Sequence, residues 1–435
     1  MTPYDKAVAS LYELQKSGMK FGLRNIRRLL HELGNPHKKF RSIHIAGSNG
    51  KGSTAAMIAS VLSAAGYRTG LYTSPHLVSF RERIRINGRP ISPSDVVRFT
   101  GLLRSMVNRH SVTFFEAVTA LAFRYFQEKK VDFAVIETGL GGRLDATNVV
   151  IPEISVITTI SREHAEILGN LIGEIAYEKA GIIKRGIPCV TGVRSRRAME
   201  VIRGVARSQR APVILPKRVR VRVRKRSFKG TRADVAVGGR PYEGLFIDLP
   251  GHHQIDNAII ALLSFHELER RGIARISEKS IRKGLAGIQK RTGLRSRLSL
   301  IRERPRMIVD VAHNPAAIAT LAKEVKRLGI SKAILVFGVM KEKDVRPMIV
   351  ALRPIVSGAV IVQPSTERAR ALGELNREFQ SANVPVLFAG SVRRGIAFAV
   401  RRAGSLGTVL ITGSHFVVGE ALASLEGKKY LTINQ

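Results

Sequence analysis

Two patterns of apolar residues alternate along this chain. Short, nearly continuous apolar runs are typical of buried strands, and stretches with an apolar residue at every third or fourth position are typical of amphipathic helices. The first part of the chain is predicted to hold strands at 69–73, 132–137 and 154–159, and helices at 94–109, 115–129, 254–271 and 278–287. Strands that alternate with helices form parallel sheets, which bind ligands at the carboxyl ends of their strands.

A glycine-rich turn joins the first apolar strand, which begins at Ser42, to a helix. Gly47, Gly50 and Gly52 allow a tight turn whose N–H groups point inward. Lys51 adds a positive charge, and a hydroxyl residue opens the helix. The spacing is not that of the common P-loop, because Gly52 separates the lysine from the hydroxyl. An ordinary glycine turn needs neither group, so we interpret the turn as a phosphate-binding loop.

The alternation restarts beyond Arg297. Strands are predicted there at 306–310, 333–337, 358–362, 386–388 and 408–412, with helices between them. The chain has 435 residues, more than one hydrophobic core usually serves. We therefore expect an α/β protein with a P-loop-type mononucleotide-binding domain over 1–294, built on a parallel sheet and preceded by two short helices. A smaller Rossmann-like C-terminal α/β domain is expected over 295–435, with the Arg297 region as the hinge.

Composition narrows the class of protein. The chain is 44% hydrophobic and 24% charged, which suits a packed globular protein. No apolar run approaches the ~20 residues of a membrane helix, so no membrane partner is expected. Thr2 before Pro3 is typical of a capped helix start rather than a signal peptide. Cys189 is the single cysteine, which excludes an intrachain disulfide and fits the cytoplasm.

The net charge of +39 raises the question of nucleic acid. The densest basic stretch, 217–226, alternates Arg with Val at the strand period, so one face is expected to be buried and the other to project arginines. Aromatic residues make up only 6% of the chain and do not interleave with these arginines, so a solvated strand face is favoured over a nucleic-acid stripe. A positive field would in any case attract ATP and polycarboxylates.

Polar side chains follow the ends of three predicted strands. Ser74, Glu137 and His164 each stand at or just after such an end. Any one of them alone is more often a helix cap or a satisfied polar residue. Mg²⁺ on ATP phosphates takes oxygen ligands, and three candidates at successive strand ends favour a magnesium site beside the phosphate loop.

Lys179 stands near the end of an otherwise apolar helix. Burial disfavours the charged form of a lysine and leaves a nucleophilic neutral amine. The alternative is a lysine that pairs with Glu178 or Glu174. The sequence leaves both interpretations open.

Several motifs, in one order, carry a family resemblance from near Phe21 to the C-terminus. They are His44–Ser53, Tyr72–Leu77 followed by Glu82–Arg85, Phe115–Glu116, Glu137–Asn148, His164, Glu178–Gly181, Gln254–Asn257, Asp310–Pro315, Gly338 with Lys343–Asp344, and Thr412–Ser414. With them the chain resembles the folylpolyglutamate synthase/dihydrofolate synthase family of the Mur-ligase superfamily. The resemblance implies a ligase that uses ATP to activate a folate or dihydropteroate carboxylate as an acyl phosphate, which the amine of L-glutamate then attacks.

The resemblance also implies roles for residues of this chain. Lys51, Lys179 and His164 would be catalytic, and Lys179 matches the family's carbamylated lysine. The nucleotide would be held by Gly47, Asn49, Gly50, Lys51, Gly52, Ser53, Asn257, Arg297 and Asp310. Mg²⁺ would be held by Ser53, Ser74, Glu137 and His164. The substrates would contact Phe115, Arg143, Asp145 and His313.

Some positions depart from the family pattern. Ser48 replaces a threonine, Glu163 replaces an aspartate, and Ser296 stands where the family has the glycine of a Pro-Gly-Arg-Leu motif. Arg24, in the segment that resembles the dihydropteroate loop, replaces an acidic residue, so the acceptor stays open between dihydropteroate, tetrahydrofolate or both. A monomer is expected. Two other functions stay open: a cell-wall amino-acid ligase, which would need a preceding UDP-sugar domain, and a nucleic-acid-dependent NTPase.

Overall fold

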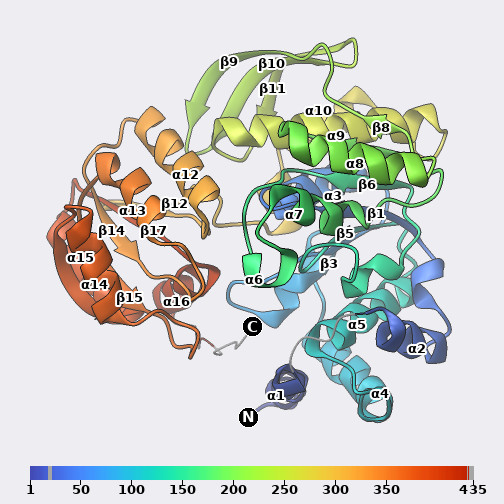
Figure 1. The fold of residues 1–435 in the computed structure, drawn as a ribbon, viewed down its shortest axis with the longest axis horizontal. Coiled ribbons are helices and arrows are strands. Elements are labelled where there is room, and N and C mark those ends of the chain that lie inside the picture. The colour runs from blue at the N-terminus through green and yellow to red at the C-terminus, as the bar shows by residue number, and fades with distance from the viewer. Residues whose placement is uncertain (18–21, 429, 431–435) are drawn as a thin grey trace.

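Three β-sheets organise the protein in the computed structural model, which describes residues 1–17, 22–428 and 430 (Figure 1). The first sheet has the order β4-β3-β2-β5-β1-β6-β7-β8. Its strands are β1 Arg41–Ala46, β2 Thr69–Tyr72, β3 Ile84–Ile86, β4 Arg89–Pro90, β5 Phe133–Glu137, β6 Ile154–Ile157, β7 Cys189–Thr191 and β8 Val213–Ile214. Strand β3 is antiparallel to both its neighbours, β2 and β4, and all other neighbours are parallel, so every strand but β3 has its carboxyl end at the same edge.

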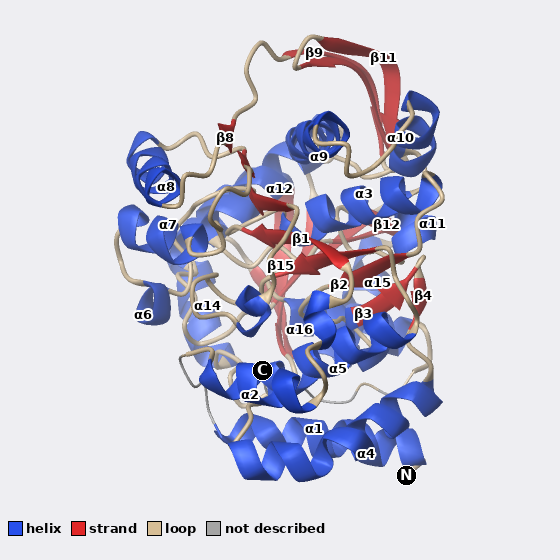
Figure 2. Cartoon of the chain, turned by 90° about the vertical axis from the view of Figure 1, so that its right-hand side faces the viewer, coloured by secondary structure: helices blue, strands red, loops and turns tan. Residues whose placement is uncertain are grey.

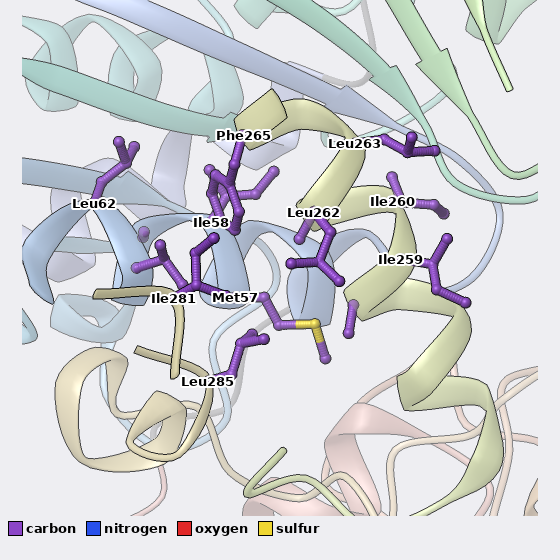
Figure 3. Close-up of a cluster of buried hydrophobic side chains, with 14 of the residues drawn as sticks. Met57, Ile58, Leu62, Ile259, Ile260, Leu262, Leu263, Phe265, Ile281 and Leu285 are labelled. Atoms are coloured by element: carbon purple, nitrogen blue, oxygen red, sulfur yellow. The ribbon is translucent and has the colours of Figure 1, made fainter. Parts of the chain in front are cut away.

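Helices cover both faces of this sheet. They are α1 Pro3–Glu13, α2 Arg24–Glu32, α3 Lys51–Ala64, α4 Pro93–His110, α5 Phe114–Glu128, α6 Ala165–Leu168, α7 Ile172–Ala180, α8 Arg196–Ser208, α9 His252–Arg270, α10 Glu278–Leu285 and α11 Ile288–Thr292. Alternate residues of β5 enter different cores: Phe133 and Val135 pack with α3, α9 and α10, while Ala134 and Ile136 pack with α1, α2, α4 and α5. Figure 3 shows the first of these cores, where Met57 and Ile58 of α3 meet Leu262 of α9 and Leu285 of α10.

The second parallel sheet lies in the C-terminal part of the chain, with the order β12-β13-β17-β14-β15-β16. Its strands are β12 Ser299–Glu303, β13 Arg306–Val309, β14 Ala333–Phe337, β15 Val356–Gln363, β16 Val386–Ser391 and β17 Thr408–Thr412. Its helices are α12 Pro315–Arg327, α13 Arg346–Leu352, α14 Leu372–Ser381, α15 Val392–Ala403 and α16 His415–Leu425. The second α/β unit expected from the pattern is therefore confirmed, although the edge strand β12 is antiparallel to β13. The boundary predicted at 294/295 stays a prediction and falls in the loop between α11 and β12.

The sequence pattern gave a wrong prediction of burial for the basic stretch at 217–226. Strands β9 Arg220–Ser227, β10 Gly230–Val237 and β11 Arg240–Ile247 form a small antiparallel sheet, with β9 at its edge (Figures 1 and 2). The expectation that one face of β9 is buried is wrong, because Val221 is 37% exposed and Val223 only half-buried. The sheet packs on α9 through β10 and β11, which supply buried residues such as Val235 and Leu245, so β9 projects beyond that support.

The N-terminal predictions hold for the described residues. Thr2 caps α1, its side chain accepting from the amide of Asp5 while the Asp5 carboxylate accepts from the amide of Thr2. Helix α2 buries Ile26, Leu29 and Leu30. Phe21, at the start of the segment that resembles a dihydropteroate loop, lies outside the described residues. None of the helices in the described part of the chain is long and apolar enough to cross a membrane.

Candidate active site

A cleft of about 1610 Å³ lies where the carboxyl ends of both parallel sheets meet. Its walls include residues that follow five strands of the first sheet and three of the second: Ser48, Ser74, Glu137, Thr158 and Gly192, and Asp310, Met340 and Gly413. The predicted placing of polar residues at strand ends is therefore observed. The cleft brings together residues far apart in the sequence, such as Asn49, whose side-chain carbonyl accepts from Asn314 Nδ2 at 3.1 Å.

The phosphate loop is shaped by its glycines. Gly50 caps α3 in the left-handed region with φ +84°, and Gly47 has φ +151°. A Cβ atom would overlap the Thr158 hydroxyl at Gly47 and the Asn257 side chain at Gly50, so neither position tolerates a larger residue. The N-terminus of α3 thus faces the cleft with free N–H groups and a positive dipole, which suits a phosphate anion. Lys51 Nζ donates to the Gly47 carbonyl at 2.9 Å.

Glu137, the last residue of β5, is buried beside this loop. Among the residues that the structure describes, it accepts one hydrogen bond, from the Ser74 amide at 3.3 Å. Burial raises the pKa of its carboxyl group, and the Lys51 and Arg297 cations oppose that rise. Arg297 approaches the same place, its Nη2 atom lying 3.4 Å from the point where a Cβ of Gly52 would be. Arg295, two residues earlier, instead pairs with Glu82 and Glu426, so of these two arginines the structure favours Arg297 in the cleft.

Lys179 is 1% exposed and its Nζ atom donates to Glu163 Oε1 at 2.7 Å and to the Gly47 carbonyl at 3.1 Å. Of the two interpretations left open, the pairing with Glu178 or Glu174 is wrong in its partner: Glu178 pairs with Arg143, and Glu174 accepts from the Leu171 amide. Burial would raise the pKa of Glu163, but Lys179 and Lys51 outweigh burial and hold that pKa at about 2. Burial also lowers the pKa of Lys179, and Glu163 only partly offsets this.

The side chains of Asp145 and Arg143, which were predicted to contact substrate, form hydrogen bonds and an ion pair with other groups of the protein. The Asp145 carboxylate accepts from the amides of Gly139, Leu140 and Thr147 at 2.8 to 3.0 Å and from the Thr147 hydroxyl, so it fixes the glycine-rich loop. Arg143 pairs with Glu178 at 2.8 Å, with 42% of its side chain exposed. Phe115 does face the cleft, where its ring packs against Gly139.

The second sheet supplies residues that are fixed by backbone contacts. The Asp310 oxygens accept from the amides of Leu298 at 2.7 Å and Ala312 at 2.8 Å. His313 Nδ1 donates to the Val311 carbonyl at 2.9 Å, and burial lowers the pKa of the His313 imidazole to about 4. Both residues line the cleft, as does Asn257, whose amide donates to Gln254.

The side chains at this edge of the first sheet suit Mg²⁺ only if a bound substrate supplies further oxygen atoms to the ion. Glu137 offers a carboxylate with one protein hydrogen bond, and Ser53 and Ser74 bring hydroxyls to the same wall of the cleft. His164 also lines the cleft, and burial lowers its pKa to about 4, so its imidazole is neutral. Within the described residues, no three histidine, cysteine or acidic side chains gather closely enough to hold a metal by themselves. The four predicted ligands therefore suit an ion that arrives on a triphosphate.

Sequence reasoning missed two charged residues of this cleft. Glu163 was noted as a departure from a family pattern, yet it is the partner of Lys179. Arg83 belongs to a quoted motif but received no role, although it is buried and lines the cleft. The sequence carries little signal for Arg83, because Phe80–Ile86 holds four charged residues and only the fold shows that Arg83 is the buried one.

Comparison with known proteins agrees with this geometry. The Mur ligase middle domain matches residues 45–265, and the Mur ligase glutamate ligase domain matches residues 296–415. The dihydrofolate synthase/folylpolyglutamate synthase of Bacillus subtilis is 38% identical, covering 96% of this chain and 98% of that protein. The folylpolyglutamate synthase of Thermotoga maritima superposes with a TM-score of 0.82 at 36% identity, covering 99% of this chain and 98% of the other. E. coli FolC in complex with DHPP and ADP gives a TM-score of 0.86 at 28% identity, over 97% of this chain and 98% of that one.

Proposed function

This chain belongs to the folylpolyglutamate synthase/dihydrofolate synthase family of Mur ligases and is an ATP-dependent acid–amino-acid ligase, and we propose that its cleft joins L-glutamate to a folate or dihydropteroate carboxylate. One observation carries the proposal: the phosphate loop and the charged side chains of Lys51, Glu137 and Arg297 meet in the cleft between the two parallel sheets. Such a set can hold a triphosphate, balance its charge and shield a reactive intermediate from water.

The loop and Lys51 bind the phosphates, because free N–H groups at the start of α3 and an ammonium group converge there. Mg²⁺, held by Glu137, Ser53, Ser74 and His164, would neutralise charge that builds up on the transferred phosphoryl group. Lys51 and Arg297 supply further positive charge at the same wall. The acceptor carboxylate attacks the terminal phosphorus, ADP leaves, and the glutamate amine then displaces phosphate from the acyl phosphate.

Nucleotide binding is supported by the E. coli relative with ADP, which has the same fold over nearly the whole chain. Asn257, Arg297 and Asp310 border the cleft from α9 and from the linker side, so movement of the second domain would change how closely they approach the nucleotide. His313 and Phe115 line the cleft as well and are proposed to contact the substrates.

Lys179 is proposed to be carbamylated in the active enzyme. Its neutral amine would add to CO₂ and lose one proton, which leaves a carbamate anion. Glu163 is only 2.7 Å from Nζ, so the new anion would need a cation beside it, and Lys51 is already near enough to shift the pKa of Lys179. The carbamate would then offer two oxygens next to the phosphate loop.

The test is a ligation assay with L-glutamate, ATP and Mg²⁺, in which dihydropteroate and tetrahydrofolate are supplied separately. We expect a product heavier by one glutamyl residue with at least one of them, together with equal amounts of ADP and phosphate. ATP hydrolysis that is stimulated by DNA or RNA, with no glutamylated product, would overturn the proposal in favour of a nucleic-acid-dependent NTPase. We also propose a cytoplasmic monomer, which size measurement and localisation of the tagged chain would check.

A further inference from the structure

Arg83 is a buried cation at the wall of the cleft. It ends the short 3₁₀ turn Phe80–Arg83, just before β3, and only 2% of the residue is exposed. It lines the cleft together with Thr113, Phe114 and Phe115 at the start of α5. No part of the proposed mechanism above uses this side chain.

The contacts of Arg83 leave its charge unbalanced. Its Nε atom donates to His76 Nδ1 at 2.8 Å, and its guanidinium lies 5.3 Å from the centre of the Phe114 ring. Its Nη2 atom is buried and has no hydrogen-bond partner among the described residues. A planar guanidinium offers five N–H donors, so most of its hydrogen-bonding capacity is unused here.

His76 cannot balance this cation. Its Nδ1 atom accepts the hydrogen bond from Arg83, while Nε2 lies 3.1 Å from the Tyr12 hydroxyl. A histidine that accepts through Nδ1 carries its proton on Nε2 and is neutral. Burial also holds the pKa of His76 well below its usual value.

The two nearby carboxylates have other partners. Glu82 accepts from the amides of Leu77, Val78 and Ser79 and pairs with Arg295 at 3.3 Å. Glu137 accepts from Ser74 and lies beside Lys51 and Arg297. In the described part of the chain, neither acid comes within ion-pair distance of Arg83.

A buried, unpaired cation is costly unless an anion meets it. The ring of Phe114 compensates in part, but a cation–π contact does not use in-plane N–H groups. Those groups suit the two oxygens of a carboxylate, which guanidinium binds in a bidentate manner. The rings of Phe114 and Phe115 line the cleft and supply a wall for a flat aromatic body next to that carboxylate, with Tyr12 and Tyr72 packed against them.

We propose that Arg83 binds the reacting carboxylate of the acceptor, at the aromatic end of the cleft and next to Glu137. This inference rests on the proposed function and names a residue that selects a carboxylate acceptor. Its position suits the task, because Arg83 and Glu137 are close enough for the charge of each to shift the pKa of the other. The carboxylate is thereby held beside the groups that receive the triphosphate.

The experiment compares two ligands in two proteins. The first ligand is whichever acceptor supports ligation, dihydropteroate or tetrahydrofolate, and the second is the same molecule with its reacting carboxylate converted to a carboxamide. Dissociation constants of both are measured in the presence of Mg²⁺ and a non-hydrolysable ATP analogue, for the wild type and for Arg83→Gln. Glutamine keeps an N–H donor for His76 but carries no charge.

We expect the wild type to bind the carboxylate roughly 10- to 100-fold more tightly than the carboxamide, because a charge-assisted hydrogen bond is lost. In Arg83→Gln the two ligands should bind within about threefold of each other. Arg83→Lys keeps the charge but not the two parallel N–H donors, so it should retain part of the preference for the carboxylate. This variant takes the place of Arg83→Gln if the glutamine variant does not fold.

Equal discrimination in wild type and variant would overturn the assignment of Arg83, because a purely structural arginine would weaken both ligands alike. A wild type that binds carboxylate and carboxamide equally would overturn it as well. Failure of the wild type to glutamylate either acceptor would instead contradict the proposed function, and this inference with it.

Discussion

The two parallel sheets meet in one cleft, but they bring different kinds of side chain to it. The first sheet contributes charged groups with few protein partners, such as Glu137, which accepts a single hydrogen bond from the described residues. The second contributes Asp310, whose two oxygens each accept a backbone amide that shapes the linker near Arg297. A charged group with spare hydrogen-bonding capacity can act on a ligand, whereas a saturated one mainly holds the protein in shape.

This difference teaches that residue type at a strand end does not decide its role. Asp145 follows β5 of the first sheet, yet its hydrogen bonds within the described chain are with its own loop, and Asp310 likewise accepts from backbone amides, of Leu298 and Ala312. The count of protein hydrogen bonds separates Glu137 from both aspartates. Glu137 and Lys51 are therefore expected to affect the chemistry, and Asp145 and Asp310 the stability.

The largest loss of activity is expected for substitutions at the carboxyl edge of the first sheet. Lys51→Ala and Glu137→Ala should each reduce kcat by roughly 10²–10³-fold or more, because each removes charge control at the phosphates. Circular dichroism and thermal unfolding should stay close to the wild type. Arg98→Ala, which removes an exposed arginine paired with Glu128 and outside the cleft lining, is the control and should change kcat by only a few-fold. Activity within about tenfold of wild type in either purified cleft variant would contradict the assigned site.

The next effect concerns the buried pair of Lys179 and Glu163. Lys179→Ala should abolish activity and cost about 3–5 kcal/mol of unfolding free energy, because it leaves Glu163 buried without its partner. If the carbamate forms, added formate or acetate should partly restore activity, while Lys179→Arg should stay inactive.

The double variant Lys179→Met with Glu163→Leu separates stability from chemistry. Replacing both charges should recover most of the stability without recovering activity. The carbamate itself is tested by measuring the intact mass of the active enzyme saturated with bicarbonate, ATP and Mg²⁺. If only unmodified Lys179 is found, its role is that of a structural ion pair.

Acid stability, by contrast, should not distinguish the two sheets. Burial lowers the pKa of His44, in β1, to about 3 and that of His313, after β13, to about 4, both from 6.5. The unfolded chain then binds protons that the folded chain does not, so this stability is present above pH 6.5 and is lost as pH falls toward 4. Each histidine contributes at most about 1.4 kcal/mol per pH unit. His44→Gln and His313→Asn should both flatten the pH dependence of urea unfolding; no change in either would contradict the burial argument.

The smallest change, in the free energy of unfolding, is expected at Ser296 in the linker. Ser296 has φ +63°, its hydroxyl is buried without a partner in the described structure, and the family pattern has glycine there. Ser296→Gly should raise the unfolding free energy by about 1 kcal/mol, because glycine adopts this conformation without strain. Urea denaturation measures it, with Ser357→Gly on β15 as a control that should not stabilise. A loss of stability in Ser296→Gly would show that the serine is not strained.

Much of this architecture follows from local pattern. The strands at Phe133–Glu137 and Thr408–Thr412 and the helices at Phe114–Glu128 and His252–Arg270 were predicted within two residues or so, since each is a long apolar or amphipathic segment. Strands β3, β4, β7 and β8 were not predicted, because two or three residues carry too little periodic signal, and β12 was not, because only two of its five residues are apolar.

Partners could not be predicted in the same way. The alternating valines of β9 have the right period for a half-buried strand, but burial depends on whether a helix lies beneath, which only the tertiary fold decides. Likewise Lys179 has two acidic neighbours in its own helix, yet it pairs with Glu163 from the loop after β6. The local sequence therefore suggests possible ion-pair partners, but the tertiary fold decides which of them lie close enough to pair.

The central claim is that the cleft transfers phosphate to a carboxylate before glutamate attacks. It can be tested by labelling both oxygens of the acceptor's reacting carboxylate with ¹⁸O and analysing the phosphate released during ligation by mass spectrometry. An acyl phosphate predicts that one labelled oxygen passes to each phosphate released with product, because the bond between carbonyl carbon and bridging oxygen breaks when the amine attacks. Phosphate free of ¹⁸O, formed in step with glutamylated product, would contradict the account.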